Sequence, residues 1–181
     1  MKKILFGIVI SCLFIACTDD KTADEKASPV TSDQKPPVEI LWDSTLTESV
    51  QASMTAFENA DIDGFTADYD DNAKFYWSGG DSLVGKQAIK DYYTGRWKLI
   101  NSLKLSNHIF LPVMAHEAPT PEIPGGKWML HWYQVNVEYK NGKKINFWAH
   151  TVSHYNDAGK IDNATQYIDR LPLMEATKDM K

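Results

Sequence analysis

The chain has 181 residues, a length that suits one domain and is too short for several. Of these residues 43% are hydrophobic, which is enough to form a buried core. It carries 24 acidic and 19 basic residues, a formal net charge of −5 at pH 7. An acidic chain lacks the basic footprint of nucleic-acid-binding domains, so we expect no nucleic-acid partner.

The first residues have the pattern of a secretory signal. Lys2 and Lys3 precede an apolar run over 4–16, which is shorter than the roughly 20 residues that a membrane span needs. The run ends in Phe-Ile-Ala-Cys, which resembles the lipobox of bacterial lipoproteins and predicts a signal peptide over 1–16 with Cys17 lipidated. Cleavage before Cys12 and an uncleaved signal anchor remain as alternatives.

The segment that follows Cys17 predicts a tether. Residues 17–38 are rich in Asp, Lys, Ser, Thr and Pro, a composition that cannot bury enough apolar surface to fold. The acidic start of this segment, over 17–21, resembles the export tag of surface lipoproteins of the Bacteroidetes. We therefore expect a lipid anchor in the bacterial outer membrane as the only membrane contact, with the cell surface favoured over the periplasmic side.

Cys12 and Cys17 are the only cysteines in the sequence. Cleavage and acylation at Cys17 would leave the folded part without a free thiol. The sequence therefore predicts neither a disulfide, nor a thiolate metal site, nor a cysteine nucleophile there.

The rest of the chain begins with helical patterns and continues with strand patterns. Apolar periodicity predicts helices over 46–60, 65–69 and 86–100, the first preceded by a capping box at Thr45 and Glu48. Alternation predicts the strands, which lie at 73–77, 103–115, 128–140, 143–155 and 160–168. Asn141-Gly142 is typical of a two-residue hairpin, and we assign 39–174 to one α+β domain and 175–181 to a tail.

Several short motifs, in order, resemble the nuclear transport factor 2-like superfamily. They are Ala-Asp-Ile-Asp-Gly-Phe at 60–65, Tyr-Asp-Asp-Asn-Ala at 69–73, Gly-Lys-Gln-Ala-Ile at 85–89, Trp97, Asn-Asp-Ala-Gly-Lys-Ile at 156–161 and Gln-Tyr-Ile-Asp at 166–169. The resemblance implies a cone, in which a curved antiparallel sheet wraps around about three N-terminal helices. Its pocket serves ketosteroid isomerases, SnoaL-like polyketide cyclases and epoxide hydrolases.

The resemblance also argues against a ketosteroid isomerase. The position of the isomerases' oxyanion-hole acid falls on Thr151, and the position of their general base falls near Trp77. Their phenolic donor comes from the first helix, where this chain has no tyrosine.

A two-residue hairpin loop predicts the strand register. It pairs Lys140 with Lys143, Trp132 with Thr151 and His131 with Val152. By the resemblance, the face with Thr151 lines the cone, which gives a predicted set of binding residues: Trp77, Trp132, Gln134, Thr151, Ser153 and Gln166. Filling of the core by these side chains is the alternative role.

The opposite face then holds His131, His150 and His154. Because neither face carries charged residues in alternation, we expect both to be covered, the outer one by a second copy in a homodimer or by Leu171–Met174 folding back. No carboxylate accompanies the histidines, so we predict no metal site and no cofactor. His150 is the candidate general base if the faces are inverted.

These observations predict a membrane-anchored lipoprotein whose cone binds a small apolar or aromatic molecule. The alternative is a cofactor-free SnoaL-like enzyme of isomerase, cyclase or hydrolase type that transfers protons with His or Asp. A hairpin displaced by one residue would favour an imidazole-driven reaction, because it would change which side chains face the helices.

Overall fold

The computed structural model describes residues 36–180 apart from 43, 119 and 122. The predicted signal peptide, Cys12, Cys17 and nearly all of the predicted tether lie outside the described residues. Residues 35–181 form a compact unit of their own. Within the described ranges, no helix combines the length and apolar character that a membrane span requires.

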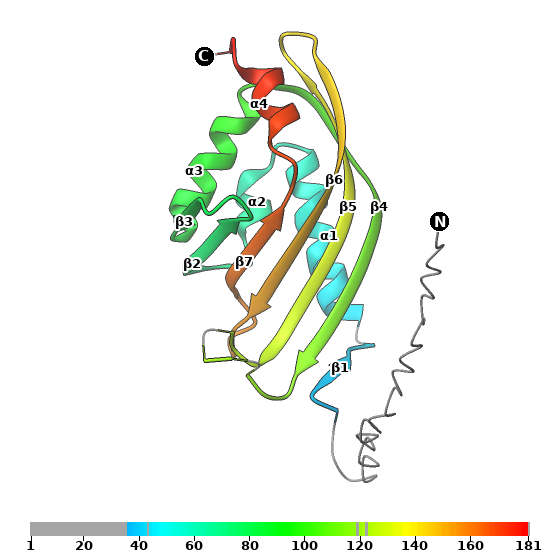
Figure 1. Cartoon of the computed structure of the whole chain (residues 1–181), viewed down its shortest axis with the longest axis vertical. Helices are drawn as coiled ribbons and strands as arrows, with labels where there is room; N and C mark the ends of the chain where they lie inside the picture. The colour runs from blue at the N-terminus through cyan, green and yellow to red at the C-terminus, as the bar shows by residue number, and fades with distance from the viewer. Residues whose placement is uncertain (1–35, 43, 119, 122, 181) are drawn as a thin grey trace, which may run out of the picture. The chain divides into compact units, whose positions relative to one another are not determined.

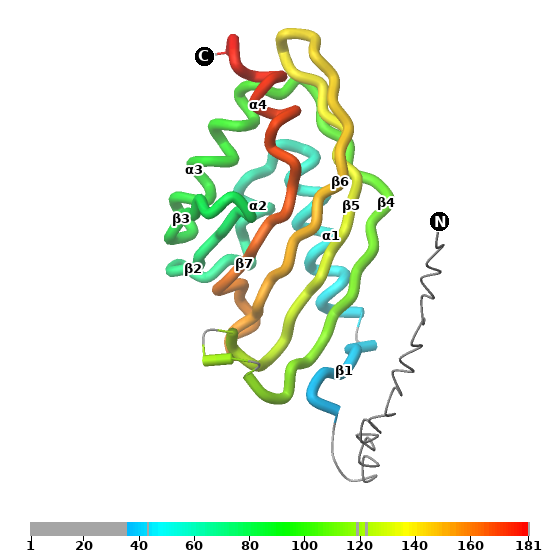
Figure 2. Tube along the Cα trace, in the orientation of Figure 1, coloured from blue at the N-terminus to red at the C-terminus, as the bar shows by residue number. Residues whose placement is uncertain are grey.

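Helices and strands follow one another much as the patterns predict (Figures 1 and 2). The helices are α1 (Ser44–Glu58), α2 (Ile62–Thr66), α3 (Lys86–Trp97) and α4 (Leu171–Thr177). The strands are β1 (Val38–Ile40), β2 (Tyr69–Trp77), β3 (Ser82–Val84), β4 (Ile100–Ala115), β5 (Gly126–Tyr139), β6 (Lys144–Tyr155) and β7 (Ile161–Tyr167).

All seven described strands form one sheet in the order β1-β4-β5-β6-β7-β2-β3. The predicted α+β fold with a curved sheet is confirmed. The sheet is mixed rather than wholly antiparallel, however, because β2 pairs with β7 in parallel. In Figure 1, α1 and α2 lie behind the long strands, and α3 lies beside β2.

The second helix begins earlier than the predicted 65–69. The Asp61 side chain accepts a hydrogen bond from the Gly64 amide at 2.9 Å and caps the helix, which ends at Thr66. Any side chain at Gly64 would collide with Asp61, because a Cβ there would lie 2.5 Å from the carboxylate. This early stop frees Tyr69 to begin β2.

The β5–β6 hairpin has a three-residue loop rather than the predicted two-residue loop. The Gly142 amide donates to the Tyr139 carbonyl at 2.8 Å, and the Tyr139 amide donates to the Lys143 carbonyl at 2.9 Å. Gly142 has φ +81°, the left-handed conformation that ends a type I turn with a G1 bulge. The loop therefore spans 140–142 instead of the predicted 141–142, which shifts the pairing of β6 with β5 by one residue.

This displacement makes the predicted register wrong. Trp132 pairs with His150, and His131 pairs with Thr151. The helix-facing side of the sheet, which we call the inner face, therefore carries His131, Tyr133 and Thr151. The other side, the outer face, carries Trp132 and His150.

A second irregularity changes what β4 presents. Its pairing with β5 shifts between Ser106 and Ile109, and Asn107 has φ +53°. Such a bulge re-aims the neighbouring side chain. It brings His108 against His131 on the inner face, while Ile109 is left exposed on the outer face.

The largest core cluster is aromatic and lies between the helices and the inner face. Phe75 is 1% exposed, with its ring 5.0 Å from that of Trp77 and 5.9 Å from that of Tyr93. Phe57 and Phe65 pack edge-on against Tyr93, with ring centres 5.3 and 5.0 Å away. Tilted and edge-on rings at these distances add to the free energy gained from burial alone.

The C-terminal helix α4 lies on the inner side, not over the outer face. Buried Ala176 packs with Ile100, Val137 and Tyr139. The alternative in which Leu171–Met174 covers the outer face is therefore wrong. Because α4 runs to Thr177, part of the predicted tail belongs to the packed domain.

Candidate functional site

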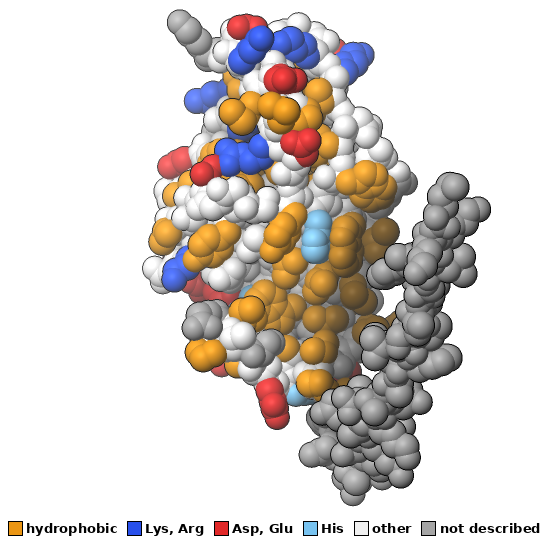
Figure 3. Space-filling view, in the orientation of Figure 1, with side chains coloured by type: hydrophobic (Ala, Val, Ile, Leu, Met, Phe, Trp, Pro, Cys, Tyr) orange, Lys and Arg blue, Asp and Glu red, His pale blue; other side chains and the backbone are white. Residues whose placement is uncertain are grey.

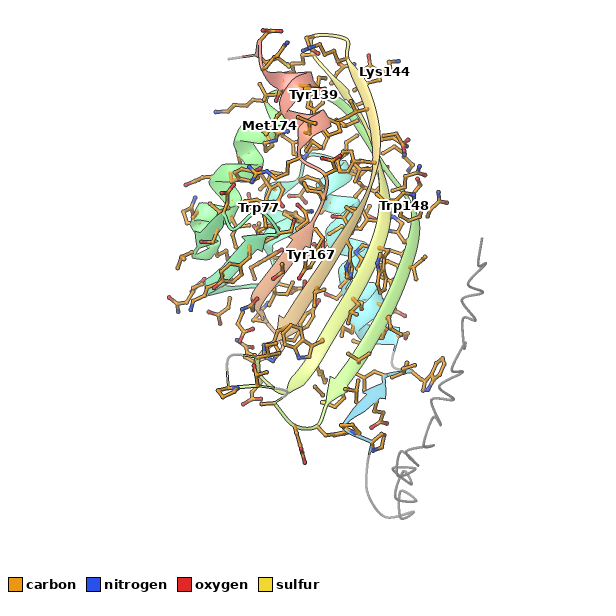
Figure 4. All side chains as sticks on the ribbon, viewed as in Figure 1. Trp77, Tyr139, Lys144, Trp148, Tyr167 and Met174 are labelled. Atoms are coloured by element: carbon orange, nitrogen blue, oxygen red, sulfur yellow. The ribbon has the colours of Figure 1, made fainter. Side chains whose placement is uncertain are left out.

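A cavity that we call the aromatic pocket opens between α3, α4 and the inner face. Its volume is about 80 Å³, below the roughly 300–1,000 Å³ of drug-sized sites, so it suits a ligand of about one ring or a short chain. Figure 4 labels Trp77, which lies between α3 and β7, and Tyr139, which lies near α4. The residues that line the aromatic pocket are Phe57, Trp77, Tyr92, Tyr93, Arg96, Ile100, Leu103, Leu105, Tyr133, Val135, Val137, Tyr139, Phe147, Gln166, Ile168 and Leu173.

Neutral polar groups form a chain along one part of this pocket. The Trp77 indole N–H donates to Gln166 Oε1 at 3.2 Å, and Gln166 Nε2 donates to the Tyr133 hydroxyl at 3.0 Å. The Tyr133 hydroxyl lies 3.5 Å from Thr151 Oγ1. Burial raises the pKa of Tyr133, so its hydroxyl stays protonated near neutral pH. Parallel pairing of β2 with β7 places Trp77 opposite Gln166 and so builds this chain.

Arg96 brings a positive charge to the other part of the pocket. It comes from the last turn of α3, and its Nη2 donates to the Tyr139 hydroxyl at 3.3 Å. Burial raises the pKa of Tyr139, although the Arg96 guanidinium opposes that rise. The hydroxyl is therefore a neutral partner that leaves the charge of Arg96 uncompensated.

A smaller cavity, the inner pocket, lies between α1 and the neighbouring part of the inner face. Its volume is about 30 Å³, and its polar lining residues are Ser49, Ser53, Asp68, Tyr69, His131, Thr151, Ser153 and Tyr155. This space is the size of one or two waters.

A pair of neutral imidazoles meets at the edge of the inner pocket. His131 is 2% exposed, and its Nε2 lies 3.0 Å from Nδ1 of His108, so one ring donates to the other. Burial, with the nearby His108 and His150 adding to it, lowers the pKa of His131 to about 3. Burial also lowers the pKa of His108. Both rings are therefore uncharged at neutral pH.

Asp68 is the carboxylate among the lining residues of the inner pocket. It accepts a hydrogen bond from the Ser49 hydroxyl at 2.5 Å and pairs with Lys160 at 3.2 Å. The Ser49 hydrogen bond, with support from Lys160, lowers the pKa of Asp68 although burial opposes it. A carboxylate held ionised in this way is a weak base.

The outer face carries a broad apolar groove of about 530 Å³, lined by residues that include Val113, Leu130, Val152 and Tyr167. Figure 3 shows hydrophobic side chains across this face, with acidic and basic side chains gathered mostly toward the end where α4 lies. Ile109, Trp148 and Tyr167 are 56%, 51% and 47% exposed. We call this surface, from Ile109 to Tyr167, the outer groove.

His150 lies at the centre of the outer face. Its ring stacks on Trp132 with centres 4.3 Å apart and lies 5.5 Å from Tyr167. Its Nε2 is buried without a hydrogen-bond partner among the described residues. Burial lowers the pKa of His150, so the ring is neutral at pH 7.

The structure divides the predicted binding residues among three places. Trp77 and Gln166 line the aromatic pocket, whereas Thr151 and Ser153 line the inner pocket. The prediction that Trp132 and Gln134 line the cone is wrong, because the one-residue register shift places both on the outer face. Gln134 bonds to Asn107 and Asn146, each at 2.8 Å.

His150, the candidate base, lines neither the aromatic nor the inner pocket. The sequence reasoning missed Tyr133, Arg96 and the His108–His131 pair. Tyr133 and His131 could have been found from a correct register alone. Arg96 follows Tyr92 and Tyr93 in one helical pattern, which gave no sign that a charge would face a pocket.

No cluster of three or more potential metal ligands occurs among the residues that the structure describes. The prediction that the three histidines share one face is wrong, because His131 lies on the face opposite His150 and His154. His154 instead bonds to Asp162 at 2.6 Å and to the Gly125 carbonyl at 2.9 Å. His154 thereby ties Gly125, the residue before β5, to Asp162 on β7.

No family model and no curated protein matches the sequence. Solved structures do share the fold. A candidate polyketide cyclase from Xanthomonas campestris pv. campestris is 18% identical, with TM-score 0.58 over 72% of this chain and 94% of its own. A nuclear transport factor 2-like protein of unknown function from Burkholderia pseudomallei is 15% identical, with TM-score 0.57 over 72% and 95%.

An epoxide hydrolase from M. tuberculosis described as LEH-like is 16% identical, with TM-score 0.54 over 74% and 90% of the two chains. At these identities the likeness establishes the fold alone. The chain therefore has the cone fold of nuclear transport factor 2-like and SnoaL-like proteins, a fold that isomerase, cyclase and hydrolase proteins share.

Proposed function

We propose that the aromatic pocket binds a small apolar or aromatic molecule. The observation that carries this proposal is the composition of its wall: aromatic and aliphatic side chains surround a few oriented polar groups, as in most small-molecule sites. The hydrogen-bond chain through Gln166 fixes the indole of Trp77 and the phenol of Tyr133. Rigid walls reduce the ordering cost of binding.

Proton transfer is the second candidate function, and the displaced hairpin makes His131 its base in place of His150. The imidazole faces a cavity, which favours this reading. Its pKa of about 3 opposes it, because a base works best when its pKa lies near the operating pH. The aromatic pocket itself has no carboxylate or imidazole in its lining. Binding is therefore the better supported function.

Filling the pocket tests the proposal. Ile168→Trp replaces an aliphatic side chain of the lining by a bulky indole ring, whereas Ile109→Trp places the same ring on the exposed outer face. Native mass spectrometry of full-length protein from its own host is expected to show one retained apolar molecule in the wild type and in Ile109→Trp, and none in Ile168→Trp. Equal retention in both variants would place the ligand elsewhere.

We also propose that the domain is held at the outer membrane by a lipid on Cys17 and faces the cell surface. Support comes from the sequence alone: the short apolar run, the lipobox-like Phe-Ile-Ala-Cys and the acidic segment after it. Metabolic labelling with a palmitate analogue tests the lipid, with Cys17→Ser and Cys12→Ser as the paired variants. Protease treatment of intact cells tests the orientation.

A second copy of the chain is the partner that we propose for the outer face. The outer groove is hollow and is flanked by protruding Trp148 and Tyr167, so a two-fold contact can place the protrusions of each copy in the groove of the other. None of the residues that line the groove is charged. The exposed patch is of the kind that marks an interaction site.

Light scattering on residues 35–181 tests the dimer. We expect a dimer for the wild type and a monomer for Val152→Asp, which buries a charge at the contact. Thr94→Asp, on the exposed side of α3, is the matched control and should stay dimeric. A monomeric wild type would overturn the proposed dimer.

A further inference from the structure

Arg96 differs from every other residue that lines the aromatic pocket, because it alone is charged. A guanidinium offers five N–H donors and stays protonated in proteins. Among the described residues its one hydrogen-bond partner is the Tyr139 hydroxyl at 3.3 Å, and it belongs to no ion pair. The remaining donors of this lining residue therefore have no partner among the described residues.

A second arginine near the pocket shows what a compensated guanidinium looks like here. Arg170 lies over the Trp77 ring, 5.7 Å from its centre, and pairs with the carboxylate of Asp81. That pair raises the pKa of Arg170. Arg96 is half-buried beside Tyr139 and has no such acid within the described part of the chain. Holding a cation in an apolar setting without an anion is costly, and an incoming anion removes that cost.

The polar groups of the pocket are segregated. Tyr133 and Tyr139 are six residues apart on β5, roughly 20 Å at the usual rise per residue, and the inward-facing residues between them are Val135 and Val137. The neutral chain of Trp77 and Gln166 lies at the Tyr133 end, whereas the guanidinium lies at the Tyr139 end. A ligand that fits both properties has an apolar body and one charged terminus.

We infer that the ligand of the aromatic pocket is an amphipathic monoanion, a carboxylate on a small ring or short chain, whose anionic group pairs with Arg96. This inference rests on the proposed binding function and adds the charge of the ligand to it. Arginine holds a carboxylate through two parallel hydrogen bonds, which adds direction to the attraction. The apolar body lies along the valine wall.

Isothermal titration of two probes, 4-phenylbutyrate and its neutral amide 4-phenylbutanamide, tests the charge. The full-length protein is held in lipid nanodiscs, with empty nanodiscs as the blank. We expect the wild type to bind the carboxylate about tenfold more tightly than the amide, as one buried charge-assisted pair allows. Added KCl should weaken binding of the carboxylate more than that of the amide.

Two substitutions at the C-terminal end of α3, one in its last turn and one at its C-cap, separate the site from the overall charge. Arg96→Gln should bring the carboxylate down to the affinity of the amide, whereas Lys98→Gln, an exposed neighbour with the same change in charge, should keep the tenfold preference. Arg96→Lys retains the charge without the two-pronged geometry and should keep part of the preference. It also serves if Arg96→Gln fails to fold, which circular dichroism would report.

The outcomes divide the two proposals. Equal binding of both probes by the wild type, or an unchanged preference in Arg96→Gln, overturns the anionic ligand and leaves the binding function standing. Absence of binding by either probe, together with no molecule retained from the host, overturns both.

Discussion

On the inner face of the sheet, buried polar groups have partners, whereas on the outer face a buried polar group has none. Tyr133 and Gln166 bond to each other, and His131 bonds to His108. His150, only two strands' width from His108, has a buried Nε2 without a partner among the described residues. Buried polar atoms are normally satisfied. Of the side chains that project from the sheet, those of the inner face therefore find partners within one chain, whereas His150 on the outer face does not. The other buried nitrogen without a partner among the described residues, Trp97 Nε1, lies on α3 rather than on the sheet.

The largest expected effect is the loss of stability when an aromatic ring is removed from the inner side of the sheet rather than from the outer face. Phe75→Ala removes a ring that is 1% exposed at the centre of the inner cluster, and should lower the free energy of unfolding by about 3–5 kcal/mol. Trp148→Ala removes a larger ring from the outer face and should cost well under 1 kcal/mol in the monomer. Denaturant unfolding at low protein concentration measures both. Similar losses would mean that the two faces are equally part of one core.

The pH dependence of the free energy of unfolding tests whether His131 is buried on the inner face. Burial lowers the pKa of His131 from 6.5 to about 3. As the pH falls below 6.5, the imidazole is therefore protonated in the unfolded chain while it stays neutral in the folded chain. Stability contributed by the neutral ring is present above the unfolded pKa and is lost toward the folded pKa. From pH 7.5 to pH 5 this loss is about 2 kcal/mol.

His131→Phe is the variant that isolates this effect. Its free energy of unfolding should fall about 2 kcal/mol less than that of the wild type over the same pH range. His108 and His150 remain in both proteins, so their titration cancels in the difference to first order. An unchanged difference between pH 7.5 and pH 5 would show that His131 is protonated readily in the folded state.

The hairpin decides which side chains each face receives. Gly142→Ala forces a side chain into φ +81° and should cost about 1 kcal/mol, because alanine rarely adopts that conformation. Asn141→Ala, which loses the bonds of its side chain to the Lys143 amide and the Ala176 carbonyl, is the companion variant. A neutral Gly142→Ala would argue for another turn and hence another register.

The smallest expected effect concerns His150. Replacing it by Phe keeps a ring between Trp132 and Tyr167 and removes the unpartnered nitrogen, so the monomer should gain up to about 1 kcal/mol. Thermal unfolding measures the change. Loss of stability or of dimer in His150→Phe would reveal that the nitrogen bonds across the subunit contact.

The sequence predicted element types better than it predicted faces. Periodicity located α1, α3 and five strands, β2, β4, β5, β6 and β7, because those signals are local. Asn141-Gly142 marked a turn correctly but not its length, since the same dipeptide fits a two-residue turn and the end of a three-residue loop. One residue of error moved Trp132 and Gln134 to the wrong side.

Other parts of the site had no local signal. The bulge at Asn107 that aims His108 inward depends on pairing with β5. The parallel pairing that sets Gln166 beside Trp77 joins segments far apart in the chain. Arg96 is an ordinary residue of a helix end until α4 and Tyr139 enclose it. Trp77 and Gln166, which the family resemblance had brought together, do line the aromatic pocket, and their role in binding stays a prediction.

The parallel pair also bears on the order of assembly. β7 stands between β6 and β2, so β2 has only the three-residue β3 beside it until the last strand arrives. A chain still being synthesised would hold Phe75 and Trp77 on an open edge from the completion of β2 until β7 follows at Ile161. Truncation before residue 161 would leave that edge permanently unpaired and make it a template for aggregation.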